Sequence, residues 1–193
     1  MRTLQEQKRQ TTADHLVASA LAALVERGVD VTVDDVAKAA GVSRRTVFRH
    51  FPSRDELLAA AIRSALAEFT RDVPHYDEAD WEGWLVEVCA VVHDVNFVYG
   101  QVELDFGARR DLPPPLADAM SETDRYRRTR NARLAERLWG AAGRDGRPPG
   151  EFVRVINTYT SPFFTQAVLR GGGGDKRLAV RLAHGAILAA LAQ

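Results

Sequence analysis

Positively charged side chains are concentrated in one short stretch of the chain. Residues 41–54, GVSRRTVFRHFPSR, contain four arginines and one histidine, whereas the whole chain of 193 residues has 26 Lys+Arg and 26 Asp+Glu. An arginine guanidinium can donate paired hydrogen bonds to a guanine edge or to a phosphate. Because the formal net charge is zero, an anionic partner is expected to be bound by this local patch rather than by an overall field.

Cap and turn signals predict that short helices present these cations. Thr32 is a good N-cap with Asp35 three residues later, and Gly41 ends that helix. Ser43 can cap a second short helix, which stops before Pro52. Two short helices joined by a glycine-containing turn form a helix-turn-helix, whose second helix enters the major groove of DNA.

The predicted second helix therefore carries the candidate DNA contacts. Residues near its start usually reach base edges, and the remaining cations bind phosphates. A solvated, arginine-rich helix face is the alternative interpretation, but the caps, the turn and the spacing together favour DNA binding. We expect base contacts from Arg44, Arg45 and Thr46, phosphate contacts from Arg49, His50 and Arg54, and further contacts from Thr32, Val33 and Ser43.

Helical signals continue along most of the sequence. Apolar residues recur at helical spacing, and alternating strands with tight hairpin turns are not evident. The first helix is expected from about Thr12 to Arg27. We predict an all-α fold of about nine helices. A three-helix DNA-binding domain spans 1–55, a fourth helix over 54–72 connects, and a second helical domain spans 75–193.

Residues 32–58, TVDDVAKAAGVSRRTVFRHFPSRDELL, strongly resemble the DNA-binding domain of TetR-family transcriptional regulators. The matching positions include the Ala-Gly-Val-Ser step at 40–43 and Phe51. Two aromatic positions that are usually tyrosines in the family are Phe48 and His50 here. Phe48 lacks the hydroxyl that often touches phosphate, so that role is not transferred to it. The usual lysine of the fourth helix is Arg54, which keeps the charge.

The C-terminal segments 161–172 and 181–191 are more weakly similar to the last two helices of that family. The resemblance implies a homodimer built on a four-helix bundle, a palindromic DNA operator, and a small-molecule effector that releases the operator, most often from a repressor. An intramolecular core face is the alternative for the last helix, and a regulator without an effector is the alternative function. The expected interface residues are Phe164, Val168, Leu178, Leu182, Ala186, Ile187 and Ala190.

The resemblance also implies an effector pocket among the middle helices. Aromatic residues at helical spacing supply material for it, although each is individually more typical of a core. The run 124–137 is basic, and a solvated face is its default interpretation; a pocket for an acidic effector is the alternative. The candidate pocket residues are Trp84, Val88, His93, Phe97, Phe106, Tyr126, Trp139, Tyr159 and Phe163.

Enzymatic motifs are not evident in the sequence. There is no phosphate-binding glycine loop or nucleophile elbow, and GGGG at 171–174 is interpreted as a linker. Cys89 and His93 are too few ligands for zinc. We therefore expect no catalytic residue, metal or cofactor. A single cysteine and the absence of a signal peptide or an apolar membrane span lead us to expect a cytoplasmic protein without a membrane partner.

Overall fold

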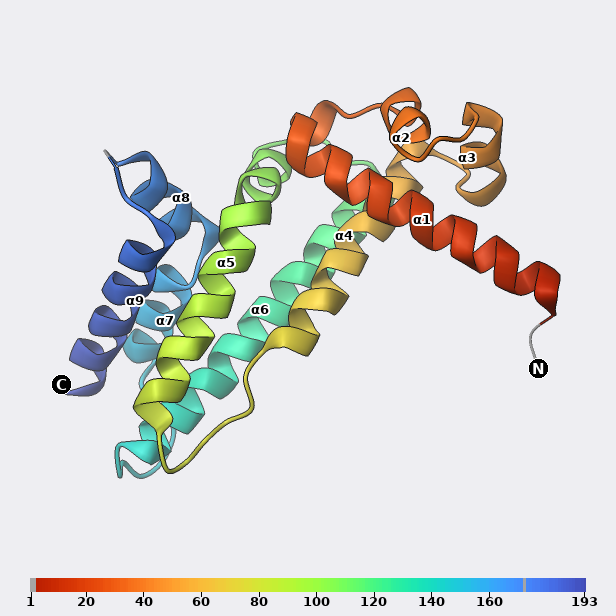
Figure 1. Ribbon diagram of the computed structural model, residues 1–193. Helices are drawn as coiled ribbons and strands as arrows, with labels where there is room; N and C mark the ends of the chain where they lie inside the picture. Colours follow the sequence, from red (N-terminus) through yellow and green to blue (C-terminus); the bar gives the residue numbers. More distant parts are fainter. Residues whose placement is uncertain (1–2, 172) are drawn as a thin grey trace. The chain divides into compact units, whose positions relative to one another are not determined.

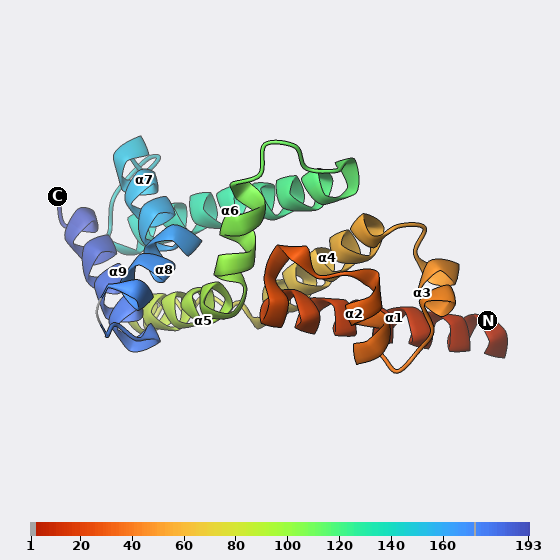
Figure 2. The same cartoon turned by 90° about the horizontal axis from the view of Figure 1, so that it is seen from above.

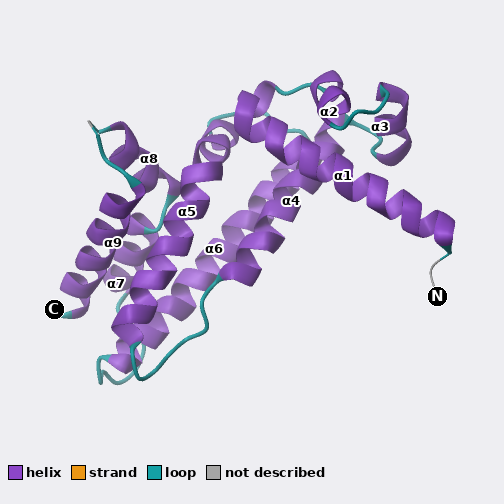
Figure 3. Ribbon diagram, viewed as in Figure 1, coloured by secondary structure: helices purple, strands orange, loops and turns teal. Residues whose placement is uncertain are grey.

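The computed structural model describes residues 3–171 and 173–193, and every regular element in that part is helical (Figure 3). The prediction of an all-α chain with about nine helices is confirmed within those residues. The helices are α1 (Leu4–Arg27), the 3₁₀ turn η1 (Gly28–Asp30), α2 (Val33–Ala39), α3 (Arg44–His50), α4 (Arg54–Asp72), α5 (Trp81–Gly107), α6 (Pro114–Ala141), α7 (Gly150–Tyr159), α8 (Pro162–Arg170) and α9 (Lys176–Leu191).

The first helix starts earlier than the sequence suggested. The Thr3 side chain accepts a hydrogen bond from the Glu6 amide, and the Glu6 carboxylate accepts one from the Thr3 amide. This capping box begins α1 two turns before Thr12. Gly28 ends the helix with a φ of 74°, a left-handed conformation that glycine adopts without steric cost.

The chain divides into two compact units. The first runs to Glu68 and includes Asp105–Thr123. In this unit α1 packs on α2, and α2 packs on α3 (Figure 1). Its fully buried residues include Leu16, Val47 and Leu57. Two ion pairs tie the later segment to this unit, namely Arg63–Glu122 at 2.9 Å and Arg109–Asp30 at 2.6 Å.

The second unit comprises Phe69–Leu104 and the chain from Asp124 onward. Its core joins apolar residues of α5, α6, α7 and α9, including Leu85, Leu138, Ile156 and Ile187. Helix α9 packs against both α7 and α8 (Figure 2). Ser161 caps α8 and Pro162 occupies its first turn, so the chain breaks between α7 and α8.

Candidate functional site

The turn between α2 and α3 has the geometry that its residues demand. The Thr32 hydroxyl accepts from the Asp35 amide at 3.2 Å, and the Asp35 carboxylate accepts from the Thr32 amide at 2.9 Å. Gly41 has a φ of 64°, which reverses the chain direction after α2. The Ser43 hydroxyl then accepts from the Thr46 amide at 3.1 Å and caps α3.

Helix α3 buries one residue and presents its cations to solvent. Val47 is fully buried, whereas Arg44, Arg45 and Arg49 are exposed. Arg44 pairs with Asp34 at 3.0 Å. Within the described chain, Arg45 and Arg49 have no acidic partner. Two strong cations on one capped helix are therefore available to an external anion.

Arg54 differs from the other expected cations because its guanidinium is already occupied. Its Nε donates to the Val31 carbonyl at 2.6 Å, Nη2 donates to the Val29 carbonyl, and Nη1 pairs with Asp55 at 3.1 Å. Arg54 thereby fastens the start of α4 to the loop before α2. Val33, another expected contact, is buried in the first unit.

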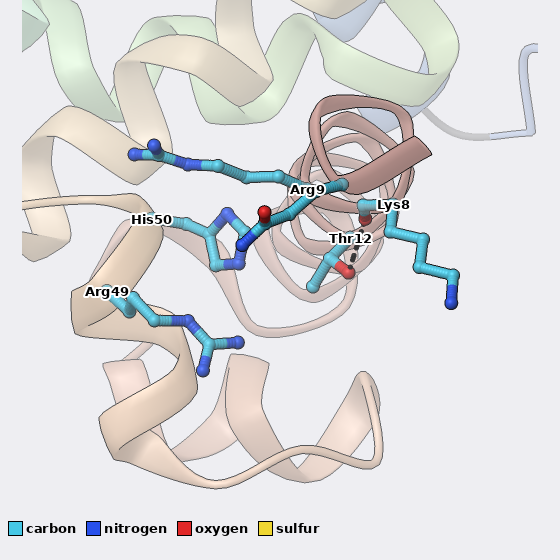
Figure 4. Close-up of a pocket in the computed structure, with 6 residues that line it drawn as sticks. Lys8, Arg9, Thr12, Arg49 and His50 are labelled. Carbon is cyan, nitrogen blue, oxygen red and sulfur yellow. Dashed lines mark hydrogen bonds between the residues drawn. The ribbon is translucent and has the colours of Figure 1, made fainter. Parts of the chain in front are cut away.

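Sequence reasoning missed the contribution of α1 to this surface. A groove of about 480 Å³ is lined by Arg49 and His50 of α3 and by one face of α1 (Figure 4). The α1 residues follow the i, i+3, i+4, i+7 spacing of a single helix face. That spacing could have revealed them, had the helix been extended to Leu4. They are Gln5, Lys8, Arg9 and Thr12.

His50 lies between the Arg9 and Arg49 side chains in Figure 4. Burial and the charges of these two arginines lower the pKa of His50 below its usual 6.5. The free protein therefore holds this imidazole neutral near neutral pH. A phosphate bound in the groove would oppose the arginine charges and raise the pKa again.

A buried polar cluster lies in the second unit, where α5 and α6 meet the turn between α7 and α8. His93 Nδ1 is 2.8 Å from the Thr165 hydroxyl. Asn96 donates to Thr165 Oγ1 at 3.0 Å and to the Thr160 carbonyl at 3.2 Å. Asn131 donates to Thr160 Oγ1 at 3.1 Å. These five side chains are all buried, and they link three helices through hydrogen bonds.

Arg130 adds a positive charge to this cluster. Its Nε and Nη2 donate to Asn131 Oδ1 at 2.9 and 2.8 Å, and Nη2 also lies 3.3 Å from Thr160 Oγ1. The guanidinium lies over the Phe69 ring, 5.5 Å from its centroid. Burial lowers the pKa of Arg130 to about 10. Burial also raises the pKa of Cys89 to about 12, so its thiol is inert.

The candidate pocket residues do not form a single group. Phe106 is buried in the first unit, Trp84 and Val88 belong to the core of the second, and Trp139 contacts Phe152. Phe97 and Phe163 are 50% and 72% exposed. Three candidates do lie around the polar cluster: His93, Tyr126, whose ring meets Phe69 edge-on, and Tyr159, which meets Phe164 edge-on.

Helix α9 carries two stripes with different surroundings. Ala179, Ala183, Ile187 and Leu191 are buried in the second unit, so Ile187 of the expected interface is already covered by its own subunit. The neighbouring stripe is partly or well exposed, and Leu182 is 46% exposed. Phe164 and Val168 of α8 are partly buried. The exposed stripe consists of Leu178, Leu182, Ala186 and Ala190.

The comparison with known protein families decides how the first unit is to be interpreted. Residues 16–61 match the model for bacterial regulatory proteins of the tetR family. This part of the chain is a TetR-family domain. The match contains all of α2 and α3, with the Thr32 and Ser43 caps and the exposed arginines.

Relatives that match part of this chain are regulators of the helix-turn-helix type. An HTH-type transcriptional regulator of Mycobacterium tuberculosis is 36% identical over 84 residues, which cover 43% of this chain and 44% of the relative. The match thus spans less than half of the length of that relative. The groove residues of α1 before residue 16 lie outside the family-model match.

Solved structures share the fold over almost the entire chain. A TetR transcription regulator from Haloarcula marismortui has a TM-score of 0.74 at 17% identity, covering 95% of this chain and 97% of that chain. The regulator LfrR from Mycobacterium smegmatis, solved in complex with proflavine, has a TM-score of 0.63 at 22% identity, with 95% and 97% coverage. At these identities the likeness shows a TetR-type fold.

Among residues 3–171 and 173–193, no three His, Cys, Asp or Glu side chains are grouped so that they could hold a metal ion. None of the helices described combines the length and the apolar character that a membrane crossing requires.

Proposed function

We propose that this protein is a homodimeric transcriptional regulator, acting as a repressor that binds a palindromic operator and is released by a small-molecule effector. Residues 1–55 bind DNA, 54–72 connect, and 75–193 hold the effector and the dimer contacts. The observation that carries the proposal is α3, a capped helix with exposed Arg45 and Arg49 that lack acidic partners in the described chain. The TetR-family match over this helix supports the assignment.

In this proposal the two cation groups have different tasks. Arg44, Arg45 and Thr46 lie in the first turn of α3, where side chains reach base edges in the major groove. The groove formed with α1 accepts a phosphate, because Lys8, Arg9 and Arg49 line it together. Arg54 is assigned a positioning role, since its guanidinium already has three protein acceptors.

Dimerisation is proposed along the exposed stripe of α9 with Phe163 of α8. A regulator that reads a palindrome needs two DNA-reading helices related by a two-fold axis, about 34 Å apart or a multiple of that spacing. Leu182 and Phe163 are large apolar side chains that are exposed in the single chain. The Leu182→Arg variant should therefore sediment as a monomer, whereas Val86→Arg, which changes an exposed apolar residue of α5, should leave the dimer intact.

An effector site in the second unit is supported by the buried polar cluster around His93 and Arg130. Burying so many polar side chains in the core of a helix bundle is costly. Their presence therefore supports a functional role for the cluster. LfrR, whose chain has the same fold, was solved in complex with proflavine. By analogy, we assign the effector to the second unit of this chain.

The test of the proposed function is selection of DNA from a random pool by the purified full chain. We expect an enriched palindrome whose affinity falls steeply with salt, because bound phosphates release counterions. The Arg45→Ala variant should lose the enrichment at one base position. The control Arg128→Ala changes an exposed arginine of the second unit and should select the wild-type site. If the wild-type protein enriches no sequence at low salt, the proposed function is wrong.

A further inference from the structure

Two neighbouring side chains orient the guanidinium of Arg44 at the start of α3. Its Nη1 donates to Asp34 Oδ2 at 3.0 Å, and Asp34 belongs to the first turn of α2. The Arg44 Cζ also lies 5.4 Å from the centroid of the Phe48 ring, one turn later on the same face of α3. A guanidinium is attracted to an aromatic face at this distance. Arg44 is therefore held in one orientation before any DNA is bound.

The contact with Asp34 leaves another edge of the Arg44 guanidinium open. Arginine carries five N–H donors in a planar fork, and Nε and Nη2 donate side by side along one edge of it. Neither atom has a hydrogen-bond partner among the residues that the structure describes, and the side chain is 61% exposed. A pair of parallel donors matches the N7 and O6 acceptors of guanine in the major groove. The free edge is thus the one that a bidentate base contact requires.

Asp34 makes Arg44 a better ligand for a base than for a phosphate. The carboxylate offsets the guanidinium charge, and its own side chain is 66% exposed. It would therefore repel a phosphate brought to Arg44, whereas a guanine edge has no net charge and is not repelled. This separates Arg44 from Arg49, which lines the groove with Lys8 and Arg9.

Phe48 places an apolar surface beside this donor edge. The ring is 42% exposed, although it lies among the cations of α3. It has no hydroxyl that could donate to a phosphate. A phenylalanine in the major groove contacts the 5-methyl group of thymine. The 5.4 Å between the Arg44 Cζ and the ring centroid lies between one and two base-pair steps of about 3.4 Å, so the two side chains suit neighbouring base pairs.

We propose that Asp34, Arg44 and Phe48 form one reading unit for a guanine and a thymine in neighbouring base pairs of each operator half-site. Arg44 donates from Nε and Nη2 to the guanine, Phe48 covers the thymine methyl group, and Asp34 is a positioning residue that keeps Arg44 off the DNA backbone. The inference rests on the proposed function and deepens it, because it names bases that the operator contains.

The first test changes single atoms of the bases in the site that the full chain enriches. Each guanine of the half-site is replaced in turn by 7-deazaguanine, which lacks the N7 acceptor, and each thymine by deoxyuridine, which lacks only the methyl group. Binding is measured by fluorescence anisotropy. Wild-type affinity should fall about fivefold or more at one guanine and about fourfold at a thymine in the neighbouring pair. Arg44→Ala should not respond to that deazaguanine, and Phe48→Ala should not respond to that deoxyuridine.

Asp34→Ala tests the positioning role with a readout that a merely structural role would not change. The released Arg44 should gain a phosphate contact, so affinity for random DNA rises, the logarithmic salt slope steepens by about 0.9, and discrimination at the guanine falls. Glu26→Ala removes another exposed carboxylate of the first unit and is the matched control. It should keep the wild-type slope and discrimination. Circular dichroism establishes that each variant folds, and Asp34→Asn replaces Asp34→Ala if the latter does not.

Three results would each overturn the reading unit. They are an enriched site in which no guanine depends on N7 through Arg44, one in which no neighbouring thymine depends on its methyl group through Phe48, and a folded Asp34 variant with the wild-type salt slope and discrimination. In these cases an enriched site still supports the proposed function. If the wild type enriches no site, the proposed function fails and the reading unit fails with it.

Discussion

Acid should destabilise this protein through His93, because the folded chain holds that imidazole neutral. The ring is fully buried, and burial together with the Arg130 charge lowers its pKa from 6.5 to about 4, although Asp94 acts in the opposite direction. Between these two pH values the unfolded chain binds a proton on His93 and the folded chain does not. Stability from this residue is therefore complete above about pH 6.5 and is lost as the pH falls toward 4.

The size of this loss follows from the two pKa values. One group in this window changes the free energy of unfolding by up to about 1.4 kcal/mol per pH unit. A folded pKa near 4 then gives a loss of roughly 2 kcal/mol at pH 5, relative to neutral pH. That loss is a large part of the stability of an ordinary domain, about 5–15 kcal/mol.

Urea denaturation of the wild type and of His93→Gln, followed by circular dichroism between about pH 7.5 and pH 5, measures the effect. Other groups titrate in both proteins, so the difference between the two pH profiles isolates His93. His75→Gln, which changes an exposed histidine, should follow the wild-type profile. Parallel profiles for the wild type and His93→Gln would show that the buried imidazole does not resist protonation, and the reasoning would fail.

The remaining predictions concern the first unit. Arg45→Ala should cost about 1–3 kcal/mol at one base pair, measured by anisotropy on operators changed one base at a time; a uniform loss over all sequences would instead mean a phosphate contact. Lys8→Ala should weaken operator and random DNA equally and reduce the logarithmic salt slope by about 0.9. Operator affinity should rise as the pH falls below the usual histidine pKa, because a phosphate favours charged His50; the same titration with His50→Gln should be flat. Gly41→Ala should cost about 1–2 kcal/mol in urea denaturation, since φ is 64° there; unchanged stability would contradict a rigid turn.

The helix-turn-helix was predictable because signals between residues close together in the sequence determine it. Thr32, Ser43 and Gly41 each act on residues within one turn of themselves, and the structure has the caps and the turn where those residues lie. The true start of α1 was missed because polar residues fill its first turns, and no apolar stripe marks them. Thr3 and Glu6 formed the only signal, and a capping box is easily overlooked without a hydrophobic run behind it.

The roles of single side chains were less predictable, because they depend on partners far away in sequence. Arg54 has the same charge as Arg49, yet its acceptors are carbonyls of the loop before α2, 23 and 25 residues away. Phe97 and Phe163 have the composition of pocket residues but are exposed. The choice between core, surface and pocket is made by packing, and helical spacing alone does not determine it.

The basic run 124–137 shows where this limit matters most for function. Helical periodicity places Arg127 and Arg130 close together on one face of α6, but it does not say which of them has a counterion. Glu103 of α5 settles the question by pairing with Arg127, and a carboxylate already bound there is a weaker partner for a second arginine. Arg130 then has only amide and hydroxyl partners in the described chain. The pairing of two helices thus decides which arginine of the run holds the carboxylate. A solvated-face interpretation of the run, reasonable for the exposed Arg125, Arg128 and Arg133, does not extend to the partly buried Arg130.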